Sequence, residues 1–208
     1  MAIQDSTLLR LETSQSETPS FVADFFTYVG RVREFTSQDW KVYIAWIGLM
    51  LGLLFAECLF LFTGHFSGVT YPIWVWNVPL GTFVFVTAIA IDTIGHRTIY
   101  KEVLKKGEAL VHHITIFAGI TSVLGLCLGY DNPEIVRAPV IALIALSVIY
   151  SLVDEVLHWH RYLTKNSDRV EMWSHFFILL GHTVMMLSWW AWYDSGYPGV
   201  KETLAALQ

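Results

Sequence analysis

The sequence has few cysteines and few charged residues. Only Cys58 and Cys127 occur among 208 residues, and both lie inside apolar runs, which excludes a disulfide framework and a cysteine-based zinc site. Charged residues make up 15% of the chain and the formal net charge is -5, so no basic surface is available to neutralise nucleic-acid phosphates. No phosphate-binding glycine loop, GxSxG elbow or cysteine nucleophile motif is present, so phosphoryl transfer and covalent hydrolysis are unsupported.

Apolar residues dominate the sequence instead. They make up 54% of the chain, and the mean hydropathy of +0.49 is well above that of a soluble domain. A hydrocarbon core of roughly 30 Å is crossed by about 20 helical residues. Segments of that length occur at 41–63, 71–96, 109–130, 138–160 and 172–193. The sequence therefore predicts an all-α integral membrane protein with five transmembrane helices.

The N-terminal part of the chain is different in character. Charged residues interrupt any apolar core there, so the pattern is not that of a cleaved signal, and the polar residues 1–20 are expected to form a flexible arm. Apolar residues recur at helical spacing from Phe21 to Val32 beside basic residues. This pattern predicts an amphipathic helix over 21–38 that lies in the membrane surface, or equally well packs on the transmembrane domain of 39–208.

The distribution of Lys and Arg predicts the orientation in the membrane. With the N-terminus inside, only Arg137 and Lys201 fall outside. Basic residues gather on the cytoplasmic side of membrane proteins, so an inner-membrane protein with a cytoplasmic N-terminus and an external C-terminus is expected. The residues on the predicted cytoplasmic side are Arg10, Arg31, Arg33, Lys41, Arg97, Lys101, Lys105, Lys106, Arg161, Lys165 and Arg169.

Prolines and glycines mark expected features of the spans. Pro72 and Pro139 stand where a helix start tolerates them, and Pro79 is expected to kink the second span. GxxxG motifs begin at Gly48 and Gly125. These motifs predict close contacts between helices, with ordinary packing as the simpler interpretation.

The ends of spans two to five repeat one pattern. A DxxxH pair closes a span and an ExxxH pair opens the next, with 11 residues between His96 and Glu108 and 12 between His158 and Glu171. A Tyr-Asp pair begins 18 residues after the last His of each copy. The pattern predicts a duplicated helical hairpin, with repeats at about 71–131 and 138–194 that form a four-helix bundle. Its eight residues are Asp92, His96, Glu108, His112, Asp154, His158, Glu171 and His175.

This topology places all eight residues at the cytoplasmic end of the bundle. Residues four apart share a helix face, so each pair can point inward, and the two copies should be related by a pseudo-twofold axis along the membrane normal. Such residues near a membrane boundary often face water, which is the simpler interpretation of a single pair. Four symmetric pairs favour a bound metal, because converging acids would otherwise repel one another.

Two resemblances accompany this ligand set. Mixed carboxylate and imidazole ligands from four helices resemble those of soluble carboxylate-bridged di-metal proteins, although the usual ExxH spacing is replaced here by DxxxH and ExxxH. Asp92, His96 and His112, like their counterparts in the second copy, are similar in outline to the Asp-xxx-His pair and further His in the C subunit of copper membrane monooxygenases. The surrounding residues do not match that subunit. Ligand chemistry favours two iron ions, with zinc, manganese or copper as alternatives.

The leading hypothesis is a membrane-embedded metalloprotein with a dinuclear centre, an oxidoreductase acting on O2, a quinol or a lipophilic substrate. The alternative is an accessory or electron-transfer subunit of a larger membrane complex, with b-type haem between opposing histidines, which the four acids disfavour. A metal-ion carrier is a third hypothesis, disfavoured because the outer halves of spans two to five hold almost no acids. The expected partners are lipid and either other membrane subunits or a second copy. The sequence identifies no catalytic residue.

A few ionisable residues lie outside the repeated pattern. His182 follows His175 by seven residues on the same helix face, so it lines a substrate or proton path or is a hydrogen-bonded core residue. Glu57 falls in the outer part of the first span, too far from the cytoplasmic end to join the site. Three residues lie on different helix faces from the predicted ligands beside them and are reserve ligands or interface groups: His113, Glu155 and His160.

Overall fold

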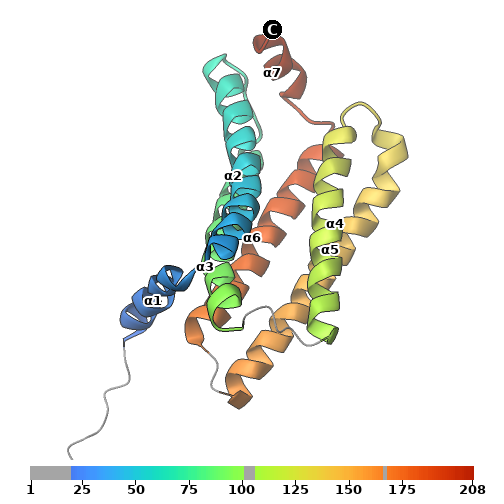
Figure 1. Ribbon diagram of the computed structural model, residues 1–208. Helices are drawn as coiled ribbons and strands as arrows, with labels where there is room; N and C mark the ends of the chain where they lie inside the picture. Colours follow the sequence, from blue (N-terminus) through green and yellow to red (C-terminus); the bar gives the residue numbers. More distant parts are fainter. Residues whose placement is uncertain (1–19, 101–105, 166–167) are drawn as a thin grey trace, which may run out of the picture.

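The chain is helical throughout the part that the structure, a computed structural model, describes: residues 20–100, 106–165 and 168–208, without the side chains of 106, 108 and 165. No strand occurs in these ranges. Five helices are long and apolar enough to cross a membrane, as predicted (Figure 1). The second of these spans includes a short 3-10 turn, residues 73–76, that leads directly into its helix. The five helices are α2 (Ser37–Phe66), α3 (Asn77–Thr98), α4 (Lys106–Leu128), α5 (Pro133–Lys165) and α6 (Arg169–Asp194).

The N-terminal region folds as a short helix that packs on the long ones. It consists of α1 (Phe21–Gly30) and the 3-10 turn η1 (Arg31–Glu34), and the Ser20 side chain caps α1 by accepting from the Ala23 amide. Tyr28 of α1 is buried against residues of α3 and α6. The α1 helix packs on the rest of the protein, but the single helix expected over 21–38 is wrong, because α1 ends at Gly30 and Ser37 already begins α2. Residues 1–19 of the expected arm lie outside the described residues.

The long helices are arranged in two tightly packed pairs. α3 packs chiefly on α6, and α4 chiefly on α5, while α2 adjoins α3 (Figure 1). At the α3–α6 crossing a Cβ added to Gly81 would lie 2.5 Å from the Met185 amide nitrogen, and one added to Gly181 would lie 2.5 Å from that of Phe85. The backbones of α3 and α6 therefore touch at two glycines, where neither helix carries a side chain.

The two GxxxG motifs have different outcomes. A Cβ on Gly125 would come within 2.5 Å of Val140 Cγ2, so this glycine does serve a close contact of α4 with α5. A Cβ on Gly48 or Gly52 would meet no atom within 4 Å. The expected close helix contact at this first motif is wrong, because that face of α2 has no helix packed against it.

Two prolines lie at other positions in their helices than the sequence predicted. Pro79 is the third residue of α3, within the first turn, where the missing amide proton has no helical acceptor and no kink is required. Pro139 lies inside α5, because that helix begins at Pro133. The expectations of a kink at Pro79 and of a helix start at Pro139 are both wrong.

The end of the molecule near the C-terminus is built from aromatic residues. Tyr71, Trp189, Trp192 and Tyr197 share one buried cluster there. A short helix not foreseen from the sequence, α7 (Val200–Ala206), packs on α2 at this end (Figure 1). The Tyr71 and Thr203 hydroxyls are hydrogen-bonded to each other. This apolar end contrasts with the opposite end, where the DxxxH and ExxxH residues lie.

Candidate metal centre

The DxxxH and ExxxH pairs lie at one end of the molecule, where α3 and α5 end and α4 and α6 begin (Figure 1). Seven of the eight predicted residues have described side chains, and these seven contact one another. The side chain of Glu108 lies outside the described residues. Asp92, Asp154, His158, Glu171 and His175 are buried, whereas His96 and His112 are half-buried.

One group of ligands joins α3 to α6. The Asp92 carboxylate lies between two imidazoles, with Oδ2 3.3 Å from His96 Nε2 and Oδ1 3.0 Å from His175 Nε2. One ligand atom from each of these three residues lies within 4.8 Å of the others. Asp92 and His96 share a face of α3 because they are four residues apart. The group could therefore hold a metal ion.

A second group joins α5 to α4. Asp154 Oδ2 lies 3.0 Å from His112 Nε2, and Asp154 Oδ1 lies 3.7 Å from His158 Nε2. Their ligand atoms also lie within 4.8 Å of one another. In both groups an Asp-xxx-His pair is completed by the histidine of the other predicted hairpin. The sequence predicted the members of each group but not this exchange, which follows from the packing of α3 on α6 and of α4 on α5.

His175 connects the two groups. Its Nδ1 lies 3.4 Å from Asp154 Oδ2, in addition to the contact of Nε2 with Asp92. Its ring stacks on that of His158 with 3.3 Å between centroids, and His158, Glu171 and His175 form a third group that could hold a metal ion. The seven side chains therefore form one continuous cluster and not two separate sites.

Three buried ligand atoms in the cluster make no hydrogen bond to the described residues. They are Asp92 Oδ1, Asp154 Oδ1 and His175 Nε2. The first and last form an ion pair at 3.0 Å, and Asp154 Oδ1 lies 3.7 Å from His158 Nε2, so each carboxylate oxygen faces an imidazole nitrogen. A cation bound between a carboxylate oxygen and an imidazole nitrogen would satisfy both atoms. The donor set therefore fits a metal of the imidazole and carboxylate class.

Glu171 is held by residues that the sequence analysis did not assign to the site. Its Oε1 lies 3.1 Å from His158 Nδ1 and 3.3 Å from Arg161 Nη1, and its Oε2 accepts a hydrogen bond from the Tyr100 hydroxyl. Burial and this hydrogen bond raise the pKa of Tyr100, so the phenol keeps its proton and remains a donor. A carboxylate on the second nitrogen of a ligating His fixes the ring and its tautomer.

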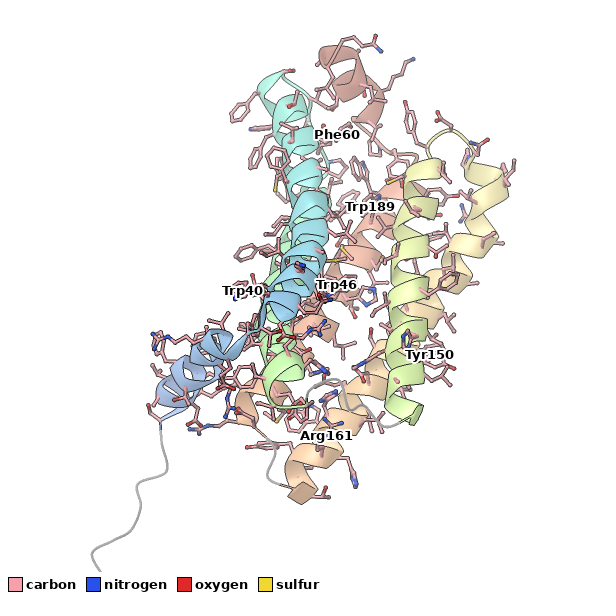
Figure 2. The ribbon with its side chains drawn as sticks, viewed as in Figure 1. Trp40, Trp46, Phe60, Tyr150, Arg161 and Trp189 are labelled. Carbon is pink, nitrogen blue, oxygen red and sulfur yellow. The ribbon has the colours of Figure 1, made fainter. Side chains whose placement is uncertain are left out.

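Helical periodicity contains the signal for these two missed residues. Tyr100 follows His96 by four residues and Arg161 follows His158 by three, so each continues the face of a predicted ligand. Arg161, labelled at the lower end of α5 in Figure 2, was used only for orientation. With Glu171 Oε1 at 3.3 Å, this arginine is a charge partner of the site as well as an indicator of membrane orientation.

The reserve ligands separate into two kinds. His113 and His160 are exposed and lie away from the cluster. Glu155 is buried, accepts from the Trp159 indole at 2.5 Å, and lines the same cavity as Asp92 and Asp154. The sequence did not anticipate this difference, because the faces of α4 and α5 that become buried depend on which helices pack against them.

A cavity of about 820 Å³ adjoins the cluster. Five of the predicted ligands line it, and His182 lies deeper along the same cavity, buried, with Nδ1 3.3 Å from the Ser151 hydroxyl. His182 therefore makes the hydrogen bond expected of a core residue, and it also lines the cavity that adjoins the cluster. The five lining ligands are Asp92, His96, His112, Asp154 and His175.

Comparison of the chain with protein-family models, curated proteins and solved structures found no match.

Proposed function

We propose that this chain is a membrane-embedded metalloprotein with a dinuclear His and carboxylate centre, iron being the favoured metal, and that it acts as an oxidoreductase on O2, a quinol or a lipophilic substrate. The observation that carries the proposal is the exchange of histidines between two Asp-xxx-His pairs, which builds two adjoining groups of three ligands. A solvated face of acids and histidines would have no reason to bury these atoms in mutual contact.

The residues divide into roles under this proposal. Asp92 and His96 with His175 hold one ion, and Asp154 and His158 with His112 hold the other. Asp154 Oδ2 lies 3.4 Å from His175 Nδ1, the ring nitrogen opposite the one that faces Asp92, so this carboxylate would also orient the His175 ring. Glu171 would orient the His158 ring, and Tyr100 and Arg161 hold Glu171 in place. The bound metals supply redox and Lewis-acid chemistry.

The duplicated hairpin belongs to the same proposal. Asp92 and Asp154, His96 and His158, and His112 and His175 are equivalent pairs in the repeat, and each group takes two members from one copy and one from the other. That exchange is what a pseudo-twofold axis through the site would generate. In the inner membrane with a cytoplasmic N-terminus, the centre would lie near the cytoplasmic boundary.

The haem alternative is poorly supported by the geometry. The Nε2 atoms of His96 and His112 face carboxylate oxygens at 3.3 and 3.0 Å, so Asp92 and Asp154 stand where a haem iron would be bound. An accessory role in a larger membrane complex remains the second candidate, because large apolar side chains are exposed along α2, α4 and α5.

Metal analysis of the purified protein tests the proposal. We expect about two metal ions per chain, no Soret band, and loss of both ions in Asp154→Asn, because this carboxylate contacts three of the histidines. His113→Ala is the matched control, since this neighbouring His is exposed and outside the cluster. Protein that is purified without chelators, carries no metal and binds none when Fe(II), Mn(II) or Zn(II) is added would refute the proposal.

A further inference from the structure

The cavity beside the cluster is long and mostly apolar. It is lined by residues of all five long helices, from the ligands at one end to Leu53, Val123 and Met186 at the other. His175 and Met186 are eleven residues apart on α6, which corresponds to about 16 Å at 1.5 Å per residue. One leaflet of a hydrocarbon core roughly 30 Å thick has the same depth.

The cavity opens sideways between α2 and α4. These two helices do not contact each other within the described ranges, and they stand apart in front of α6 in Figure 1. Apolar lining residues on both helices are exposed, among them Leu49 at 58%, Ile116 at 42% and Leu124 at 58%. Both helices have membrane-spanning length, so this opening faces lipid tails and not water.

Glycines form part of the cavity wall. Gly48 and Gly52 line it from α2, where an added Cβ would meet nothing within 4 Å, and Gly119 lines it from α4, where an added Cβ would lie 3.7 Å from His182 Nε2. The GxxxG motif of α2 thus keeps a groove open. Trp46, labelled on the lower half of α2 in Figure 2, lines the groove nearer the ligand end.

Polar atoms are confined to the ligand end and the middle of the groove. The Thr115 hydroxyl and Glu155 Oε2 are buried there, without a hydrogen-bond partner among the described residues. Ser151 and His182 bond to each other farther along. A ligand with one polar end would satisfy the first two groups while its apolar part occupied the rest.

We propose that this groove binds a single-chain amphiphile from the bilayer. The hydrocarbon chain enters between α2 and α4 and lies along Gly48, Gly52 and Gly119, and the polar end reaches Thr115 and the metal ligands. The polar end then lies nearer the membrane boundary and the tail nearer the midplane, as in the bilayer itself. This amphiphile would be the substrate of the proposed metal centre. Its reaction therefore rests on the proposed function, whereas its binding in the groove does not.

Photocrosslinking in lipid nanodiscs tests the groove. The probe is a palmitic acid analogue with a diazirine in mid-chain and a terminal alkyne, applied to the full-length protein. We expect its crosslinks on lining residues such as Leu49 and Ile120 to exceed at least tenfold those on Leu51, Phe55 and Phe117, which are exposed and do not line the groove. Equal labelling of both sets would overturn the assignment.

Two variants fill the groove from opposite walls. Gly48→Leu with Gly52→Leu, and separately Gly119→Val, should each reduce the groove crosslinks at least fivefold. Gly30→Leu is the control, because that glycine also has open space around it but lies in α1, outside the groove. Groove crosslinks that persist in both folded variants would refute the proposal.

Metal content measured on the same samples separates this inference from the proposed function. The groove variants should keep their metal, since they alter no ligand, and His158→Ala, at a proposed ligand that does not line the groove, should keep the crosslinks after losing metal. Specific crosslinks in a protein that binds no metal would reject the dinuclear centre and retain the lipid site. Metal binding without specific crosslinks would reject the lipid site and retain the dinuclear centre.

Discussion

His112 and His175 occupy equivalent places in the two proposed copies but differ in environment. His175 is buried and lies 3.0 and 3.4 Å from Asp92 and Asp154, whereas the His112 side chain is 20% exposed and, among the described carboxylates, pairs with Asp154 alone. The cause is the position of their helices, because α6 packs on both α3 and α5 while α4 packs chiefly on α5. Equivalent residues therefore share a ligand type but not a coordination environment.

The two histidines should give different losses when they are removed. We expect His175→Ala to abolish binding of both metals, because this ring joins all of the α3 ligands to the α5 ligands, and His112→Ala to lose one of about two. Inductively coupled plasma mass spectrometry of both purified variants gives the measurement. Equal losses of metal would show that the centre is symmetric and that the more buried histidine is not the more important ligand.

The next effect concerns the contact of α3 with α6. Gly181 of α6 corresponds in the proposed repeat to Ala118 of α4, which is fully buried and already carries a Cβ. Gly181→Ala should destabilise the fold by about 3 kcal/mol, the upper end of the usual cost of overpacking, because its Cβ would lie 2.5 Å from backbone atoms that cannot turn aside. Ala118→Gly is the reciprocal change and should cost about 1 kcal/mol. Thermal unfolding in detergent compares the two, and similar losses would contradict the asymmetric packing.

A smaller effect separates Tyr100 from Tyr162, which follow His96 and His158 by four residues each. The Tyr100 hydroxyl donates to Glu171, whereas the Tyr162 ring packs on Trp159. Tyr100→Phe should weaken metal affinity about tenfold, as expected for loss of an outer hydrogen bond, and Tyr162→Phe should leave it unchanged. Competition with a chelator measures both affinities. An unchanged affinity in Tyr100→Phe would show that Glu171 needs no such support.

The smallest effect is a loss of stability at alkaline pH. Burial raises the pKa of Tyr100 above its ordinary value of 10.0, so the folded protein retains a proton that the unfolded chain releases. Stability should therefore fall as pH rises above 10.0, and less steeply in Tyr100→Phe than in Tyr162→Phe. Unfolding temperatures from pH 8 to 11 test this, and parallel curves for the two variants would contradict it.

The helices and the ligand types could be predicted because both depend on local periodicity. Apolar runs of membrane-spanning length located all five long helices, and the DxxxH spacing identified residues that share a face. The predicted helix contact at Gly48 and the predicted helix start at Pro139 are wrong for a different reason. Whether a glycine faces a helix or a groove, and where α5 begins, depends on neighbours that lie far away in the sequence.

The sequence by itself determined that the chain is helical, apolar enough for a membrane, and supplied with acids and histidines four residues apart. Only the tertiary structure decided that α3 pairs with α6 and α4 with α5, so that each Asp-xxx-His pair meets the histidine of the other hairpin and a groove remains between α2 and α4. The physical reason is that periodicity fixes which side chains share one helix face, whereas the partner of that face is chosen by packing between helices.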